Sequence, residues 1–258
     1  MPNLTNPKLI EFIESQIVVP FYSSRLNSLN NKTLEDLLKT KNPYLFRVKN
    51  PTVVGDYVKQ MLDAFLSSSE ETIFGKSLEK LAVYVCGVEF GGYKPNEGEF
   101  PSIDLIFENK NTLYIVGIKS GSVWGNADSI NKMIENIHKS SKIFKTQGYT
   151  KIELVSGICY GQSKITENKI AKSKLTYKKY FGKEFWELIS GDEDFYRTIV
   201  IPIGQAIKGR DLDYKDQYDK KINELTQQMF EKYTLNSQIN WELIVEVNSG
   251  IKTASSNI

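Results

Sequence analysis

A carboxylate and an amine, Asp104 and Lys119, are the residues of this sequence best placed to do chemistry. Each belongs to a stretch rich in Ile, Leu, Val and Tyr, and the polar residues 108–111 between the two stretches favour a short hairpin turn. The hairpin would bring both side chains to one end of a sheet. A carboxylate offers an oxygen ligand to Mg²⁺, and a lysine can orient an attacking water or offset phosphate charge. The pair therefore predicts metal-dependent hydrolysis of a phosphodiester.

The alternative interpretation of Asp104 is an outward-facing residue on an alternating strand, but Lys119 at the end of the partner strand would then be a coincidence. We favour the catalytic interpretation because an acid and an amine that converge at strand ends are typical of a site. Other chemistries lack their residues. His138, the one histidine, lies on an expected polar helix face. Cys86 and Cys159 stand too far apart in the sequence for a zinc cluster.

The charge of the chain is nearly balanced, with 33 basic and 31 acidic residues, but one stretch is strongly basic. Residues 164–183 hold seven lysines and a single acid, interleaved with aromatic residues. This pattern predicts contacts with nucleic-acid phosphates, and its alternative is a solvated lysine-rich face. Trp124 either lines the groove for DNA or packs under the sheet. The predicted DNA-binding residues are Trp124, Lys164, Lys169, Lys172 and Lys174.

The apolar spacing predicts an α/β protein with helical ends. Helices are expected at residues 7–20 (ending before Pro20), 33–39, 53–67, 73–87, 126–146 and about 216–233, and strands within 101–121, 151–160 and 198–204. The absence of a repeat or low-complexity linker favours a single domain over 1–258, with a helical part at 1–70, a core at 72–205 that contains Asp104 and Lys119, and a helical part at 210–250. No apolar run is long enough for a membrane span and no secretory signal is evident, so we expect a cytoplasmic protein.

The hairpin resembles the signature of the PD-(D/E)xK nuclease superfamily, which is an Asp, a hairpin, and then Glu or Asp, any residue, and Lys. Pro101 and Asp104 stand for the first part and Lys119 for the last, whereas Gly117 occupies the position of the second acid. Residues 73–87 are similar to the first core helix of these nucleases, and 157–163 to the strand after the central helix. Residues 180–191 are similar to a segment of type II restriction endonucleases that cut around a GGNCC core. The resemblance covers about residues 72–205.

The resemblance implies a mixed central sheet flanked by helices, double-stranded DNA as substrate and Mg²⁺ as cofactor. Asp104, the carbonyl of Ile118 and Glu79 would hold the metal, and Lys119 would act on the water. Gly117 leaves three explanations open. Glu135 or Glu79 supplies the missing acid, or the chain is a silenced nuclease, or Asp104 suffices with a carbonyl and waters. We favour the first two equally.

Cleavage of both strands at a symmetric site implies a homodimer, with the N-terminal and C-terminal helices as its surfaces. A cognate DNA methyltransferase is expected in the same system, with no direct contact implied. Two rival functions remain. One is a repair or phage-type nuclease of the same superfamily with little sequence preference. The other is a DNA-binding protein with a decayed nuclease core, for which Gly117 is the main argument.

Overall fold

The computed structural model describes residues 7–121, 127–162, 166–169, 176–207 and 209–251. Their contacts divide the chain into two compact units. Unit 1 contains the described residues of 1–19 and 74–206, and unit 2 those of 20–73 and 207–258. Helix α5 (Val54–Phe90) contributes its first part to unit 2 and the remainder to unit 1. The organisation of 1–258 as one nuclease domain stays a prediction.

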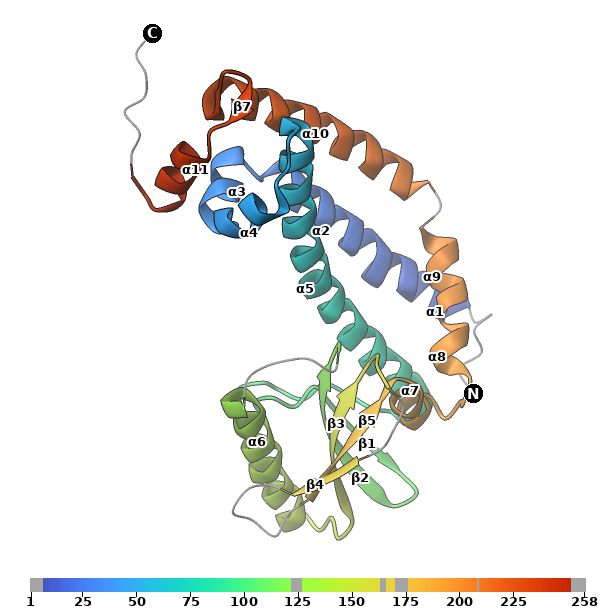
Figure 1. Ribbon diagram of the computed structural model, residues 1–258. Coiled ribbons are helices and arrows are strands. Elements are labelled where there is room, and N and C mark those ends of the chain that lie inside the picture. The colour runs from blue at the N-terminus through green and yellow to red at the C-terminus, as the bar shows by residue number, and fades with distance from the viewer. Residues whose placement is uncertain (1–6, 122–126, 163–165, 170–175, 208, 252–258) are drawn as a thin grey trace. The chain divides into compact units, whose positions relative to one another are not determined.

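Unit 1 is built around a mixed sheet (Figure 1). Its elements are α1 (Pro7–Phe12), the π-helix η1 (Ile13–Val18), the later part of α5, β1 (Leu105–Asn109), β2 (Thr112–Lys119), α6 (Ala127–Thr146), β3 (Ile152–Ile158), β4 (Thr166–Lys169), β5 (Thr176–Phe181), α7 (Gly182–Ser190), α8 (Phe195–Thr198) and α9 (Val200–Ala206). Within the described residues the sheet has five strands in the order β1-β2-β3-β5-β4. The two central pairings, β2 with β3 and β3 with β5, are parallel, and the two outer ones are antiparallel.

The predicted hairpin is confirmed as β1 and β2. Lys110 and Asn111 form its turn with φ angles of 49° and 59°, the left-handed conformation that a two-residue hairpin turn requires. The expected helix at 126–146 corresponds to α6 and the expected strand at 151–160 to β3. Thus α6 connects the parallel strands β2 and β3, as a crossover helix does.

Helices α6 and α7 are packed against the sheet of unit 1. Met133, Ile134 and Ile137 of α6 are buried in one core with Ile106 and Ile115 of the hairpin. Helix α7 approaches β3 so closely that a Cβ on Gly157 would lie 2.2 Å from the Phe185 ring. Only a residue without a side chain allows this packing.

Unit 2 is helical apart from a short β-ribbon. It comprises α2 (Val19–Asn30) from Pro20 onward, α3 (Leu34–Thr40), α4 (Pro43–Lys49), the first part of α5, α10 (Arg210–Tyr233), β6 (Thr234–Leu235), β7 (Gln238–Ile239) and α11 (Trp241–Asn248). Its core combines α5 residues such as Tyr57 and Met61 with Leu225 and Met229 of α10. A capping box between Thr33 and Asp36 begins α3.

Three expectations about local structure were wrong. Residues 198–204 are helical in α8 and α9, and Pro202, in the first turn of α9, needs no intrahelical N–H. The N-terminal helical segment continues past Pro20, because α1, η1 and α2 follow one another without a break. Pro20 comes two residues after the π-helix η1, where the Val19 N–H bonds to the Glu14 carbonyl and the i→i−4 pattern that a proline interrupts is already absent. The helices expected at 53–67 and 73–87 are one helix, since the residues between them include no Gly or Pro.

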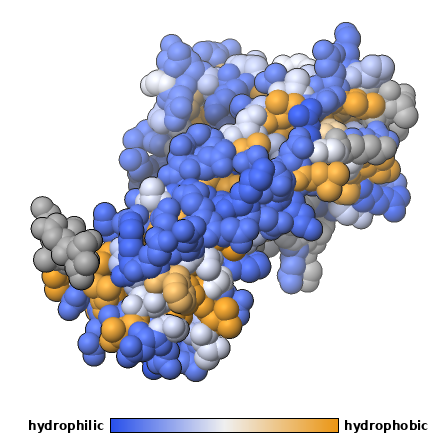
Figure 2. Space-filling model, turned by 90° about the horizontal axis from the view of Figure 1, so that it is seen from above, coloured by the Kyte–Doolittle hydropathy of each residue, from blue (hydrophilic) through white to orange (hydrophobic). Residues whose placement is uncertain are grey.

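Hydrophilic side chains predominate on the face shown in Figure 2, and hydrophobic ones lie there in separate patches. No helix of the described part of the chain combines the length and apolar character needed to cross a membrane.

Candidate active site

Asp104 and Lys119 meet at one end of the sheet, as the hairpin predicts. Asp104 immediately precedes β1, and its N–H donates to the carbonyl of Val116 (2.9 Å). Its carboxylate Oδ2 accepts a hydrogen bond from the Ile118 N–H (2.7 Å) and lies 3.9 Å from the Lys119 ammonium. The N–H and C=O of one strand residue point to the same neighbouring strand. The Ile118 carbonyl is therefore directed to the side of β2 on which Asp104 lies.

The segment before Asp104 is held by α6. Ser102 has a φ of 66°, unusual for a residue other than glycine, and its hydroxyl accepts a hydrogen bond from the Asn136 amide (3.0 Å). Asn136 thus fixes the turn that leads into β1. The position of Asp104 depends on both neighbours, the strand β2 and the helix α6.

Glu79 of α5 reaches this site through a lysine that the sequence did not single out. The Lys94 ammonium lies 2.5 Å from Glu79 Oε1 and 3.8 Å from Asp104 Oδ1. Tyr93, the preceding residue, pairs with Ile106 of β1 through two backbone hydrogen bonds of 2.9 Å. This isolated bridge aligns Lys94 with the hairpin, and the local sequence around Lys94 carries no pattern that would have revealed it.

Burial governs the electrostatics of the site. It raises the pKa of the Asp104 carboxyl, and the nearby Glu79 charge adds to this, while the Ile118 N–H, Lys119 and Lys94 oppose it. For Lys94, burial would lower the pKa, but the hydrogen bond to Glu79 and the charges of Glu79 and Asp104 outweigh it and raise the pKa. Burial, followed by the charges of Glu79 and Asp104, raises the pKa of the Cys159 thiol to about 12. The site therefore concentrates negative charge that lysines balance.

A cavity of about 290 Å³ opens beside Asp104 and Lys119. Lys94, Glu97, Ser129 and Met133 are among its other lining residues. Such a polar hollow at strand ends can accept a phosphate and a hydrated cation.

Gly117 and Glu135 do not supply a second acid to this cavity. Gly117 is buried on β2, and a Cβ there would lie 3.1 Å from both Met133 Sδ and the Ser102 carbonyl oxygen. Glu135 is exposed on α6 and is not among the residues that line the cavity of Asp104. The structure thus brings Asp104, Lys119 and Glu79 together, and it does not bring Glu135 to them.

The donor set suits magnesium. Asp104 Oδ1, a Glu79 oxygen and the Ile118 carbonyl are all oxygen ligands, which Mg²⁺ prefers, and Mg²⁺ keeps several waters. Within the described ranges, no three His, Cys, Asp or Glu side chains converge to hold a metal. A metal at this site would therefore depend on two carboxylates, a backbone carbonyl and water.

The comparison with protein families agrees with this geometry. The family model described as Type II restriction endonuclease EcoO109I matches residues 7–211. The chain belongs to this family. No curated protein matches the chain. The EcoO109I family is one of DNA-cleaving enzymes, and the match includes the hairpin, Glu79 and Lys94.

Most of the residues predicted to bind DNA in this EcoO109I-family chain lie outside the part of the chain that the structure describes. Trp124, Lys164, Lys172 and Lys174 lie outside the described residues, and Lys169 is described only as part of the backbone of β4. Their DNA contacts stay a prediction. Among the neighbouring lysines, Lys178 pairs with Glu153 at 2.7 Å and Lys183 lies 3.9 Å from Glu193. Part of the basic stretch thus also makes ion pairs within unit 1.

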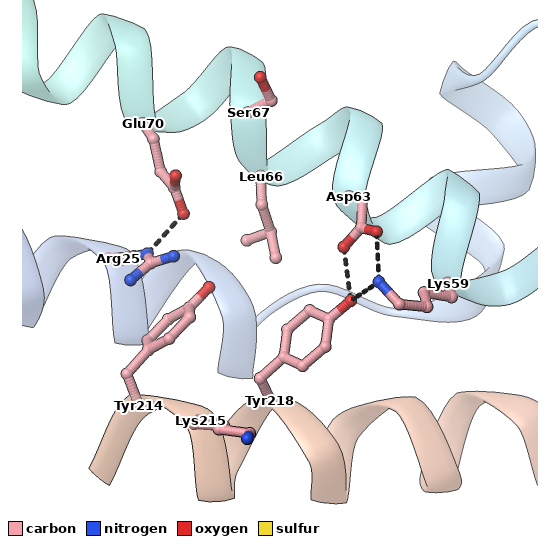
Figure 3. A pocket seen from close by; sticks show the side chains of 9 residues that line it. All are labelled: Arg25, Lys59, Asp63, Leu66, Ser67, Glu70, Tyr214, Lys215 and Tyr218. Carbon is pink, nitrogen blue, oxygen red and sulfur yellow. Dashed lines mark hydrogen bonds and ion pairs between the residues drawn. The ribbon is translucent and has the colours of Figure 1, made fainter. Parts of the chain in front are cut away.

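Another cavity, of about 310 Å³, lies within unit 2 and has several charged side chains in its lining (Figure 3). There the Arg25 guanidinium of α2 pairs with Glu70 of α5 and lies 3.5 Å from the Tyr214 ring centroid of α10. Asp63 of α5 accepts hydrogen bonds from Tyr218 of α10 (2.5 Å) and from Lys59 (2.7 Å). Because these charged groups neutralise one another, we interpret the cavity as a structural network that joins three helices of unit 2.

Proposed function

We propose that this EcoO109I-family chain hydrolyses phosphodiesters of double-stranded DNA at a specific short site, with a PD-(D/E)xK core that uses Mg²⁺. The observation that carries the proposal is the convergence of Asp104, the Ile118 backbone and Lys119 at one end of the β1–β2 hairpin. A carboxylate, a strand carbonyl and a lysine in this order are what metal-dependent phosphodiester hydrolysis requires.

Each residue has a defined part in the proposed reaction. Asp104, Glu79 and the Ile118 carbonyl would hold the metal beside the scissile phosphate. Bound there, Mg²⁺ would lower the pKa of water and stabilise charge on the leaving oxygen. Lys119 would orient the attacking water and, as an ammonium, offset the charge that builds on the phosphoryl group. Its Nζ, 3.9 Å from the Asp104 carboxylate, lies close enough to act on the same phosphate.

The finer features of the proposal have separate support. The similarity of residues 180–191 to enzymes that cut around GGNCC supports a site of that class. A homodimer is proposed because cleavage of both strands of a symmetric site requires two centres related by a two-fold axis. Helix α4 supports a dimer surface in unit 2, because Tyr44, Leu45 and Val48 are 66%, 51% and 84% exposed. These are large apolar side chains on one short helix.

Gly117 supports a second candidate, a DNA-binding protein with a decayed nuclease core. The absence of an acid at position 117 removes a metal ligand that the superfamily signature contains, and Glu135 does not replace it in the cavity. Glu79 lies near Asp104 through Lys94, and Glu97 is another acid among the residues that line the cavity of Asp104. The two candidates therefore differ on whether Asp104 and Glu79 suffice.

Cleavage of unmethylated phage DNA with Mg²⁺ tests both candidates. Four proteins are compared: the parent chain, Gly117→Glu, Lys119→Ala and the control Lys151→Ala, which removes an exposed lysine away from the cavity. We expect discrete fragments from the parent chain and from Lys151→Ala, and none from Lys119→Ala. Fragments only from Gly117→Glu would favour the decayed core. DNA binding without cleavage by every variant would refute the nuclease assignment of this site.

A further inference from the structure

Lys94 connects the two carboxylates of the site. Its ammonium lies 2.5 Å from Glu79 Oε1 and 3.8 Å from Asp104 Oδ1. We propose that the Lys94 ammonium occupies the metal position between Glu79 and Asp104 in the DNA-free protein. The ammonium must move away when a divalent cation binds. This inference rests on the proposed function, because it assumes that Asp104 is a metal ligand.

The two oxygens of Asp104 have different surroundings. Oδ2 accepts the Ile118 N–H at 2.7 Å and faces Lys119. Oδ1 is the oxygen that Lys94 approaches. A metal would bind through Oδ1, since Oδ2 already accepts the Ile118 N–H and has the Lys119 ammonium 3.9 Å away. The oxygen that is open to a cation therefore already has one beside it.

A divalent cation and the ammonium cannot occupy this place together. Mg²⁺ binds carboxylate oxygens at about 2.0–2.1 Å. A metal that binds both Glu79 and Asp104 would lie within a few ångströms of the present Lys94 ammonium, where like charges repel strongly because the site is partly shielded from water. The ammonium would have to leave before both carboxylates could bind the metal.

The backbone of Lys94 is fixed, but its side chain has room to move. Tyr93 is paired with Ile106 of β1, and Pro95 restricts the backbone of Lys94 to extended conformations. The placement of the ammonium between the carboxylates thus follows from the fold. The Lys94 side chain is 45% exposed, compared with 14% for Asp104, so the ammonium can rotate into solvent without disturbing the core. Displaced in this way, it stays at the rim of the cavity, where the charge of a DNA phosphate would arrive.

Binding of Mn²⁺ to the DNA-free chain, followed by electron paramagnetic resonance of the free ion, tests this role. Lys94→Met removes the ammonium, and Lys94→Arg keeps a positive charge. Lys151→Met is the matched control, because Lys151 is an exposed lysine away from the cavity of Asp104 and its loss changes the net charge equally. We expect Lys94→Met to bind Mn²⁺ about tenfold more tightly or better, and Lys94→Arg and Lys151→Met to stay within about twofold of the parent chain.

Adding Asp104→Asn separates this inference from the proposed function. The gain of Lys94→Met should disappear in the double variant with Asp104→Asn. Unchanged or weaker Mn²⁺ binding by Lys94→Met would overturn the role of Lys94, while a loss of binding in Asp104→Asn alone would leave the metal assignment intact. If Asp104→Asn leaves Mn²⁺ affinity unchanged both in the parent chain and in Lys94→Met, the assignment of Asp104 as a metal ligand would be overturned instead. If Lys94→Met fails to fold, Lys94→Gln, which keeps a donor for Glu79, carries the same expectation.

Discussion

Position 117 offers a quantitative test of how the second acid of the signature would fit this fold. A Cβ on Gly117 would lie 3.1 Å from Met133 Sδ, 3.1 Å from the Ser102 carbonyl oxygen and 3.4 Å from Ile137 Cδ1. A glutamate must therefore displace the Met133 thioether, which is flexible, while the backbone oxygen can give little. Overpacking of this kind costs about 1–3 kcal/mol. Replacement of a strand glycine offsets about 0.5–1 kcal/mol of this cost, because glycine loses more backbone entropy on folding than other residues. We predict that Gly117→Glu lowers the free energy of unfolding by up to about 2.5 kcal/mol.

Removal of Met133 should relieve this strain. Met133→Ala alone is expected to cost about 2–5 kcal/mol, because Met133 is buried and its loss leaves a cavity. In the double variant the methylenes of the introduced glutamate fill part of that space, so the combined loss should be smaller than the sum by at least about 1 kcal/mol.

Urea denaturation of the four proteins of this cycle measures the coupling. The control cycle pairs Gly117→Glu with Met229→Ala, a buried methionine in the core of unit 2, for which we expect additive losses. A coupling with Met133 below about 0.5 kcal/mol would show that position 117 does not face α6 and would refute the reasoning.

Three further predictions follow from burial and charge. Asp104→Asn should raise the stability of the metal-free protein at neutral pH. Burial is the main cause that raises the pKa of Asp104, so the parent chain loses stability as the pH rises through that raised value. The extra stability of Asp104→Asn should therefore vanish below the ordinary carboxyl range. Thermal melts between acid and neutral pH measure the two melting temperatures, and a difference between them that does not change with pH would contradict this prediction. Arg25→Met should lower the free energy of unfolding by about 1–2 kcal/mol in urea, because its ion pair and its contact with Tyr214 are both lost; an unchanged midpoint would refute this. Cys86 and Cys159 should resist a thiol reagent at pH 8 until urea unfolds the chain, because burial raises both thiol pKa values to about 12; rapid native labelling would count against it.

The part of the site that follows from local sequence could be predicted. The hairpin turn at Lys110 and Asn111 fixes which strand positions face each other, so Asp104 and Lys119 were expected to meet, and they do. The helical period also indicates that Glu135 points away from the sheet. With Met133 and Ile137 directed at the sheet, a residue two positions after Met133 points the other way, in agreement with the exposure of Glu135.

Features that depend on tertiary contacts could not be predicted. Lys94 enters the site because one residue, Tyr93, pairs with Ile106, and a single bridge leaves no periodic pattern. The β-branched residues around Val200 favour a strand in isolation, but their place after the helical turn of α8 makes them helical. In both places, packing determines a structure that local preference does not contain.

Localised hydroxyl-radical cleavage of the protein by bound Fe²⁺, in complex with a DNA fragment, tests the central claim most directly. Fe²⁺ takes the metal position, and the radicals it generates with ascorbate and peroxide cut the polypeptide nearby, so mass spectrometry of the fragments locates the metal without requiring that the chain cleave DNA. We predict cuts close to Glu79, Asp104 and Ile118 that are lost in Asp104→Asn. Cuts elsewhere in the chain, or cuts that persist in Asp104→Asn, would contradict the assignment of this hairpin as the metal-dependent nuclease site.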